Sequence, residues 1–305
     1  MRTGVFPSPG SAKPDSMVRW VRGSGDTLKF DMDKKNQRVA LVTGVSSGIG
    51  LACAMHLAAR GFRVYGTSRR PAANASGGIT LLTADVTDDA SVEQAVATVL
   101  EREGQLHVVV NNAGMGIAGP LESTTTEQAK RQLEVNFFGA LRVCRAVLPV
   151  MRSQRSGYIV NIGSIGGLIA IPYQAMYSAS KFALEGMSEA LRMEVRPFGI
   201  RVVIIEPGDH KTAITQNRTL TAISAGADVY RASFESAVAK TANDEQNGPG
   251  PEQIARLLYR IVNQRNPRLR YTIGPIPQRA AVWLKRLAPY SLLEYGMRTY
   301  YNLGG

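Results

Sequence analysis

Residues 38–54, RVALVTGVSSGIGLACA, run from a β-branched apolar segment through a glycine-rich turn into an apolar helical pattern. Glycines at positions 44, 48 and 50 let the backbone turn tightly and approach a ligand closely. A helix that starts at this turn directs unpaired N–H groups and the positive end of its dipole toward a phosphate group. The glycine spacing alone also fits an ordinary tight turn, but its place between a strand and a helix favours a dinucleotide site.

The same change from strand to helix repeats along the chain. β-branched runs occur at 62–68, 79–85, 107–112, 158–164, 200–208 and 270–274, and helical patterns at 48–60, 91–103, about 126–152, 173–196 and 251–264. Alternation of this kind is typical of a parallel sheet covered by helices on both faces. The sequence therefore predicts the α/β class, as a single doubly wound, Rossmann-type domain with a seven-stranded parallel sheet.

Length and composition fit one large globular domain. The chain has 305 residues, of which 44% are hydrophobic and 20% are charged. Its two cysteines, Cys53 and Cys144, are too few for a disulfide framework, which favours a reducing cytoplasmic location. Its three histidines lack the spacing of zinc ligands, so we expect no metal site.

The formal net charge of +12 is concentrated near the two ends of the sequence. Residues 1–36 carry 7 Lys/Arg and 4 Asp/Glu, and residues 251–305 carry 9 and 2, whereas residues 37–250 carry 20 and 18. A nucleic-acid-binding protein spreads basic side chains over a folded face. The charge distribution therefore argues against a nucleic-acid partner.

Three segments stand outside the regular alternation. We expect residues 1–36, rich in Gly, Pro, Ser and charge, to be a mobile leader before a domain at 37–274. The long connector 209–250 follows a strand and predicts a substrate lid, or else a surface excursion with a small core of its own. Residues 275–305 predict a basic amphipathic helical extension, as a cap over the substrate mouth or a subunit contact rather than a membrane-surface helix. No apolar run reaches the ~20 residues that span a bilayer.

Tyr177 and Lys181 lie four residues apart in a helical pattern, so their side chains share one face. A free phenol has a pKa near ~10 and rarely exchanges protons at neutral pH, whereas a neighbouring ammonium favours the phenolate. We therefore expect Lys181 to lower the pKa of Tyr177, which suits a general acid for carbonyl reduction or a base for alcohol oxidation. Ordinary amphipathic packing also produces such a pair, but Ser164 ends an upstream strand, where open α/β sheets place their ligands.

Several motifs together resemble the classical short-chain dehydrogenases/reductases. They are TGxxxGxG at 43–50, Asn111-Asn112-Ala113-Gly114, Ser164, Tyr177-Ser178-Ala179-Ser180-Lys181 and Pro207-Gly208. The resemblance covers roughly residues 38–274 and implies a catalytic domain at 37–274 with strand order 3-2-1-4-5-6-7. It also implies homodimers or homotetramers that assemble through the helices at about 126–152 and 173–196.

The resemblance implies a catalytic tetrad of Asn136, Ser164, Tyr177 and Lys181. Ser164 would bond the substrate oxygen, and Asn136 would hold a water that relays protons to Lys181. An asparagine inside an apolar helix otherwise destabilises the helix, so its presence at position 136 supports a specific role for this side chain. Lys181 would also bond the nicotinamide ribose.

The implied cofactor is NADP(H), with NAD(H) as the alternative. The cofactor would contact Gly44, Ser46, Ser47, Gly48, Ile49, Gly50, Ser68, Arg69, Asp85, Val86, Asn112, Ala113, Gly114, Tyr177, Lys181, Pro207, Gly208 and Thr212. NAD-dependent enzymes place an acidic residue at the end of the second strand, where this chain has Ser68 followed by Arg69. We therefore expect Arg69 to bind the 2′-phosphate of NADP.

The substrate is expected to be apolar, since the run VYGTSR at 64–69 and the C-terminal extension resemble the hydroxysteroid- and retinol-dehydrogenase-like branch. That branch implies an oxidoreductase that interconverts a ketone or aldehyde with an alcohol, on a steroid-, retinoid- or aryl-ketone-like substrate. Candidate pocket residues are Gly116, Ile117, Ile165, Gly166, Gly167, Ile171, Tyr173, Gln174 and Ile214. The alternatives are a 3-oxoacyl-carrier-protein-type reductase, an NAD-preferring alcohol dehydrogenase, and a catalytically silent NADP-sensing or scaffold protein. The last usually lacks the tyrosine or the lysine that this chain keeps.

Overall fold

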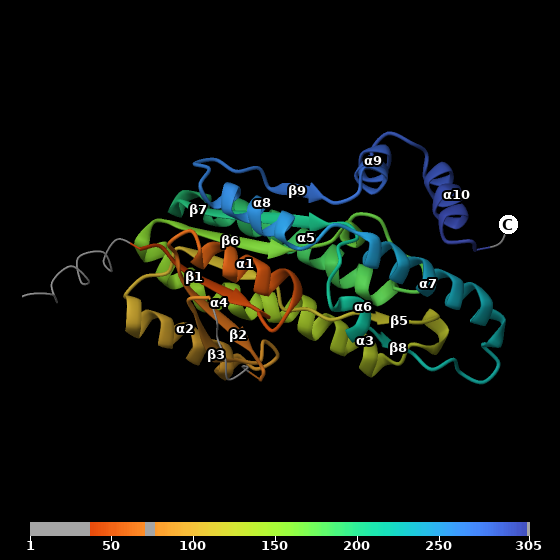
Figure 1. The fold of residues 1–305 in the computed structure, drawn as a ribbon, viewed down its shortest axis with the longest axis horizontal. Coiled ribbons are helices and arrows are strands. Elements are labelled where there is room, and N and C mark those ends of the chain that lie inside the picture. The colour runs from red at the N-terminus through yellow and green to blue at the C-terminus, as the bar shows by residue number, and fades with distance from the viewer. Residues whose placement is uncertain (1–36, 71–76, 304–305) are drawn as a thin grey trace, which may run out of the picture. The chain divides into compact units, whose positions relative to one another are not determined.

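The computed structural model describes residues 37–70 and 77–303, which are shown as ribbon in Figure 1. The predicted leader at 1–36 lies outside the described residues. So do residues 71–76, between the second and third strands in the sequence.

Seven parallel strands form the main sheet in the order β3-β2-β1-β4-β6-β7-β9. They are β1 (Val39–Thr43), β2 (Arg63–Ser68), β3 (Ile79–Thr83), β4 (Val108–Asn111), β6 (Gly157–Ile162), β7 (Ile200–Pro207) and β9 (Arg270–Ile273). Counted along the chain within this sheet, the order is 3-2-1-4-5-6-7, which confirms the predicted topology. β1 lies at the centre of the reversal, where Leu41 is in register with Tyr65 on one side and Val109 on the other.

Helices cover both faces of this sheet because successive strand residues point to opposite sides. Ala40 and Val42 pack under α1 (Gly48–Ala58) and α8 (Glu252–Val262). Val39 and Leu41 pack in the other core, beneath the remaining large helices. Those helices are α2 (Asp89–Glu103), α4 (Gly139–Gln154) and α5 (Ala175–Val195).

The helix predicted at about 126–152 is present, and it contains a π-helical turn that was not predicted. A capping box between Thr125 and Gln128 starts α3 (Thr126–Leu133), which passes through a π-helical turn at Glu134–Phe138 into α4. Inside this turn, the buried Asn136 bonds both backbone groups of Met115. A π turn inserts one residue into the helical ladder and is common at functional sites. Helical periodicity alone did not reveal it.

The long connector is an ordered insertion. It contains α6 (Ile214–Asn217), β8 (Thr219–Leu220) and α7 (Arg231–Asn247). β8 pairs in parallel with β5 (Ile117–Ala118), in a second, two-stranded sheet. Each of these strands has only two residues, too few for a recognisable strand pattern.

The C-terminal segment contains two helices. It forms α9 (Ile276–Leu284) and α10 (Tyr290–Tyr300), which lie beyond the end of β9 in Figure 1. Among the helices at 37–70 and 77–303, none combines the length and the apolar character needed to span a membrane.

Candidate active site

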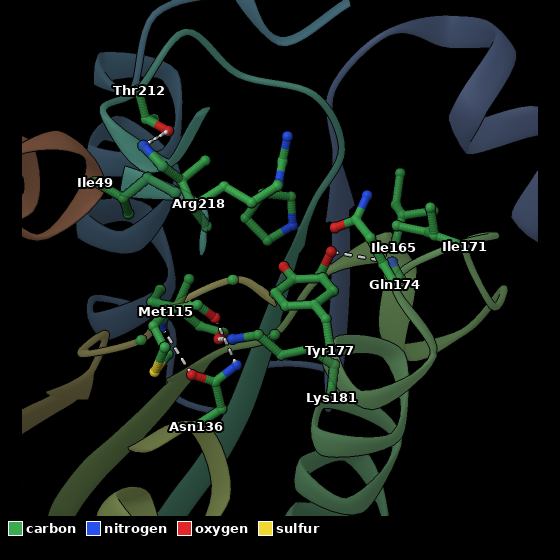
Figure 2. A pocket seen from close by; sticks show the side chains of 18 of the residues that line it. Ile49, Met115, Asn136, Ile165, Ile171, Gln174, Tyr177, Lys181, Thr212 and Arg218 are labelled. Atoms are coloured by element: carbon green, nitrogen blue, oxygen red, sulfur yellow. Dashed lines mark hydrogen bonds between the residues drawn. The ribbon is translucent and has the colours of Figure 1, made fainter. Parts of the chain in front are cut away.

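A pocket of about 1180 Å³ lies at the carboxyl ends of the central strands. One part of it borders the glycine turn and the ends of β2 and β4, and another borders the insertion and the two C-terminal helices. Open α/β sheets bind ligands at this edge, beside the reversal in strand order. Figure 2 shows Tyr177 with its ring directed into this space between Arg218 and the Ile165–Gln174 segment.

The glycine turn has the conformation that the sequence predicts. Gly44 and Gly48 have φ values of 72° and 60°, which favour glycine. A Cβ on Gly50 would lie 2.3 Å from both the Asn112 Nδ2 and the Gly44 carbonyl oxygen. Gly50 therefore packs behind the turn, whereas Gly44 and Gly48 line the pocket. Ser47, the N-cap of α1, makes no side-chain capping bond, so it leaves the first helix N–H groups uncapped by that side chain.

Asn112 and Thr43 fasten this turn to the end of β4. The Asn112 amide donates to the carbonyl oxygens of Thr43, at 2.8 Å, and Gly44, at 3.0 Å. In return, the Thr43 hydroxyl accepts hydrogen bonds from the backbone N–H groups of Asn112 and Ala113. Asn112 is among the residues predicted to contact the cofactor, whereas Thr43 is not. The motif TGxxxGxG could have indicated Thr43, because Thr43 is its first residue.

All the other predicted cofactor residues line the same pocket. They are Ser46, Ser47, Ile49, Ser68, Arg69, Asp85, Val86, Asn112, Ala113, Gly114, Tyr177, Lys181, Pro207, Gly208 and Thr212. Arg69 is exposed. Burial raises the pKa of Asp85, but hydrogen bonds from Thr87 and the charge of Arg69 outweigh it and hold that pKa below its usual value.

Ser164 and Tyr177 meet inside the pocket. Ser164 follows β6 and begins a short 3-10 turn, where its hydroxyl accepts the Gly166 N–H at 3.0 Å. Tyr177 lies in the first turn of α5, and a Cβ on Gly166 would lie 3.1 Å from its Cε1 and 3.3 Å from the Ser164 Oγ, so the two side chains lie close together. Burial raises the pKa of Tyr177, and the neighbouring Ser164 hydroxyl opposes that rise only in part.

Lys181 lies one helical turn after Tyr177 and is buried. Its Nζ donates to the Ile162 carbonyl oxygen at 2.8 Å and lies 5.9 Å from the centre of the Tyr177 ring. Burial lowers the pKa of Lys181 to about 8, against the opposing charge of Glu185. In this structure burial outweighs any effect of Lys181 on the pKa of Tyr177, and the ammonium donates to a backbone carbonyl. The lowering of that pKa by Lys181 together with a bound nicotinamide stays a prediction.

Asn136 ties three parts of the site together. Its Oδ1 accepts the Met115 N–H at 2.9 Å, and its Nδ2 donates to the Met115 carbonyl oxygen and the Ser180 hydroxyl. Figure 2 shows this contact beside Lys181. Because Ser180 lies next to Lys181 on α5, Asn136 connects the segment after β4 to the helix that carries Tyr177 and Lys181.

Two-thirds of the predicted substrate-pocket residues line the pocket. Gly116, Ile165, Gly166, Ile171, Gln174 and Ile214 line it, whereas Ile117, Gly167 and Tyr173 do not. Ile117 is buried in β5, and Gly167 packs against the backbone of Lys181. The Tyr173 hydroxyl bonds Ser233, and its ring lies 5.5 Å from that of Phe234. These three residues support the pocket from behind.

Polar residues of the insertion form a wall of the pocket that is absent from the predicted site residues. Arg218 and Glu245 form an ion pair with side chains only 5% and 10% exposed, and Thr215 donates to the same carboxylate. Asp209 pairs with Gln278 of α9, and burial raises the pKa of Asp209 to about 6. His210 is buried, and its Nδ1 lies 2.9 Å from the Gly208 carbonyl oxygen. No motif marks these residues, since folding alone brings them together.

Known proteins resemble this chain over most of its length. Residues 38–222 match the short chain dehydrogenase family. A 3-ketodihydrosphingosine reductase from Bacteroides thetaiotaomicron is 43% identical over 266 residues, which are 87% of this chain and 98% of that protein. A short-chain dehydrogenase from Streptomyces avermitilis is 33% identical with a TM-score of 0.72, over 86% of this chain and 98% of that one. ElxO, solved with NADP bound, is 25% identical with a TM-score of 0.65, over 78% of this chain and 97% of that one.

The parallel sheet, the glycine turn and these likenesses define the class of protein. The chain belongs to the short-chain dehydrogenase family, a family of oxidoreductases that use NAD(P)(H) and act on alcohol and carbonyl groups.

Proposed function

We propose that this protein reduces the ketone of an apolar substrate with NADPH, and oxidises the alcohol in reverse. The observation that carries the proposal is the position of Tyr177 and Ser164, close together in the pocket that the glycine turn also lines. A proton donor thus lies in the same space as the element suited to a dinucleotide pyrophosphate.

The residues present fit the cofactor. A side chain at Gly44 would be strained by its positive φ and would meet the Ala113 Cα at 2.9 Å, so the surface is shaped by the bare backbone. Arg69 and Ser68 line the pocket at the end of β2, where a 2′-phosphate is expected. Bound NADPH would supply the hydride.

The chain's own groups supply the proton and stabilise charge. Tyr177, kept protonated by its raised pKa, donates its proton to the substrate oxygen as negative charge develops there. Ser164 offers a second hydrogen bond to that oxygen. Lys181 provides a buried cation one helical turn after Tyr177. Asn136 holds the backbone of Met115 beside this site. The water relay through Asn136 remains part of the proposal.

The substrate end of the pocket supports an apolar substrate. Ile165, Ile171 and Ile214 line it, together with Leu284 of α9 and Leu293 of α10. The Bacteroides relative is named for a ketone on a long alkyl chain. We therefore place 3-ketodihydrosphingosine first among the candidate substrates, before steroid, retinoid and aryl ketones.

We also propose that residues 209–250 act as a lid, because Thr212, Ile214, Arg218 and Glu245 line the pocket from this insertion. A cytoplasmic location is supported by the free thiols of Cys53 and Cys144. Association into dimers or tetramers through α4 and α5 is supported by Phe138 beside α4, 41% exposed, and Met193 on α5, 67% exposed.

The experiment is a coupled assay of NADPH oxidation with ketones graded by chain length and polarity. We expect turnover to increase with alkyl chain length and to include 3-ketodihydrosphingosine. NADPH binding without oxidation by any ketone in the panel would favour a silent, NADP-sensing protein. Faster turnover of carrier-bound than of free 3-oxoacyl groups would favour a carrier-protein reductase.

A further inference from the structure

The outer face of the C-terminal helices exposes large apolar side chains. We define this face by Ile276, Trp283, Leu287, Tyr290 and Tyr295, each between 64% and 78% exposed. Trp283 lies seven residues after Ile276 and four residues before Leu287. At this helical spacing the three side chains share one side of α9 and the turn after it. Clustered exposure of this kind marks an interaction site, whereas single exposed apolar side chains do not.

The same face is basic. Arg279 and Arg286 are exposed and lie three or four residues from Trp283, so they flank it. Residues 276–303 contain four Lys/Arg and one acidic residue, Glu294. Two-fold pairing with a second copy would bring this positive face against itself, because a two-fold interface joins identical patches. An anionic surface complements it instead.

A different side of each of these two helices faces the pocket. Pro277, Ala281 and Leu284 line the pocket from α9, and Leu293 and Met297 line it from α10. Their spacing at 277, 281 and 284 places them on a different side of α9 from Ile276 and Trp283.

Two leucines join the pocket to the outside. Leu284 and Leu292 line the pocket and are also 44% and 55% exposed. An apolar path therefore runs from the outer surface of the helix pair to the substrate end of the pocket.

We propose that the outer face of α9 and α10 docks on the surface of an anionic lipid bilayer. Helices that carry Trp and Leu among cationic side chains lie in the interface between headgroups and acyl chains, without crossing the membrane. The docking does not depend on the proposed reaction. The passage of a lipid-like substrate past Leu284 and Leu292 rests on the proposed function.

The test is co-sedimentation of the full chain with vesicles of phosphatidylcholine, alone or mixed with phosphatidylglycerol. We expect binding to the mixed vesicles, weakened by added salt because exposed charges are screened. Trp283→Ser and Leu287→Ser should each weaken binding about tenfold or more, since burying such a side chain is worth ~1.5–3 kcal/mol. Arg279→Glu with Arg286→Glu should abolish the preference for anionic vesicles.

The matched control is Leu121→Ser, since Leu121 is 64% exposed, like Trp283, and lies outside the insertion, α9 and α10. It should leave vesicle binding unchanged. All these variants should keep wild-type turnover of a short, water-soluble ketone, because none of the changed residues lines the pocket. Turnover without vesicle binding overturns the docking alone, whereas vesicle binding without turnover overturns the reaction alone.

Sedimentation analysis without vesicles identifies the competing occupant. A dimer that dissociates on Trp283→Ser, with no binding to either kind of vesicle, would show that a second copy covers this face and would overturn the proposal.

Discussion

The Lys181 Nζ lies 5.9 Å from the centre of the Tyr177 ring, and its hydrogen bond goes to the Ile162 carbonyl oxygen. Both side chains lie on α5, one turn apart, at the carboxyl end of β6. Lys181 therefore lies near the phenol as a buried amine without bonding it, whereas Ser164 lines the same pocket beside the phenol.

Changing Glu185 should alter the pH dependence through Lys181. Glu185 lies one turn further along α5, near Glu206 of β7 and paired with Arg270 of β9. Its negative charge raises the pKa of Lys181, which burial otherwise lowers to about 8. If activity needs protonated Lys181, it falls as pH rises through that pKa. In Glu185→Gln this fall should move to lower pH.

Glu189→Gln is the matched control for that pH profile. Glu189 also pairs with Arg270, at 2.7 Å, but it is largely exposed and has no effect on the pKa of Lys181. Its profile should match that of the wild-type protein. Equal shifts in the two variants would mean that Arg270, rather than the charge beside Lys181, controls the titration.

Arg69→Asp should move cofactor preference from NADPH toward NADH. Losing a charge-assisted bond to the 2′-phosphate costs ~1.5–3 kcal/mol, or about tenfold or more in the ratio of kcat/KM values. Arg70→Asp is the control, because Arg70 is equally exposed but does not line the pocket. An unchanged ratio in Arg69→Asp would exclude Arg69 as a phosphate ligand.

Gly50→Ala should destabilise the fold and weaken cofactor binding together. The new Cβ would lie 2.3 Å from the Gly44 carbonyl oxygen, so the glycine turn has to shift, at a cost of about 1–3 kcal/mol. Thermal unfolding and NADPH titration measure the two effects.

Gly186→Ala on α5 is the control for that variant, since its Cβ meets nothing within 4 Å. It should stabilise the protein by about 0.5–1 kcal/mol, because alanine favours the helix. Normal stability in Gly50→Ala would show that the turn tolerates a side chain.

The sequence predicts the elements that carry strong local patterns. The β-branched runs and the glycine turn specify β1, α1 and the order of the main sheet, since burial on both faces demands continuous apolar strands. It also predicts Ser164, Tyr177 and Lys181 as neighbours, because helix spacing and strand ends fix their positions.

Other features depend on contacts between distant segments. The π turn at Asn136 is stabilised by Met115, twenty-one residues away in the chain. The Arg218–Glu245 pair forms only when α7 folds back on the segment after α6. The direction of the Tyr177 pKa shift follows from burial, which residue spacing does not reveal.

The most direct test of the account compares Tyr177→Phe with the wild-type protein in NADPH-dependent ketone reduction. Phenylalanine keeps the ring but removes the proton donor, so turnover should fall by about 10²-fold or more. NADPH affinity, measured by fluorescence titration, should stay within about twofold, or ~0.4 kcal/mol, because the aromatic ring is retained. Wild-type turnover in Tyr177→Phe would contradict the account.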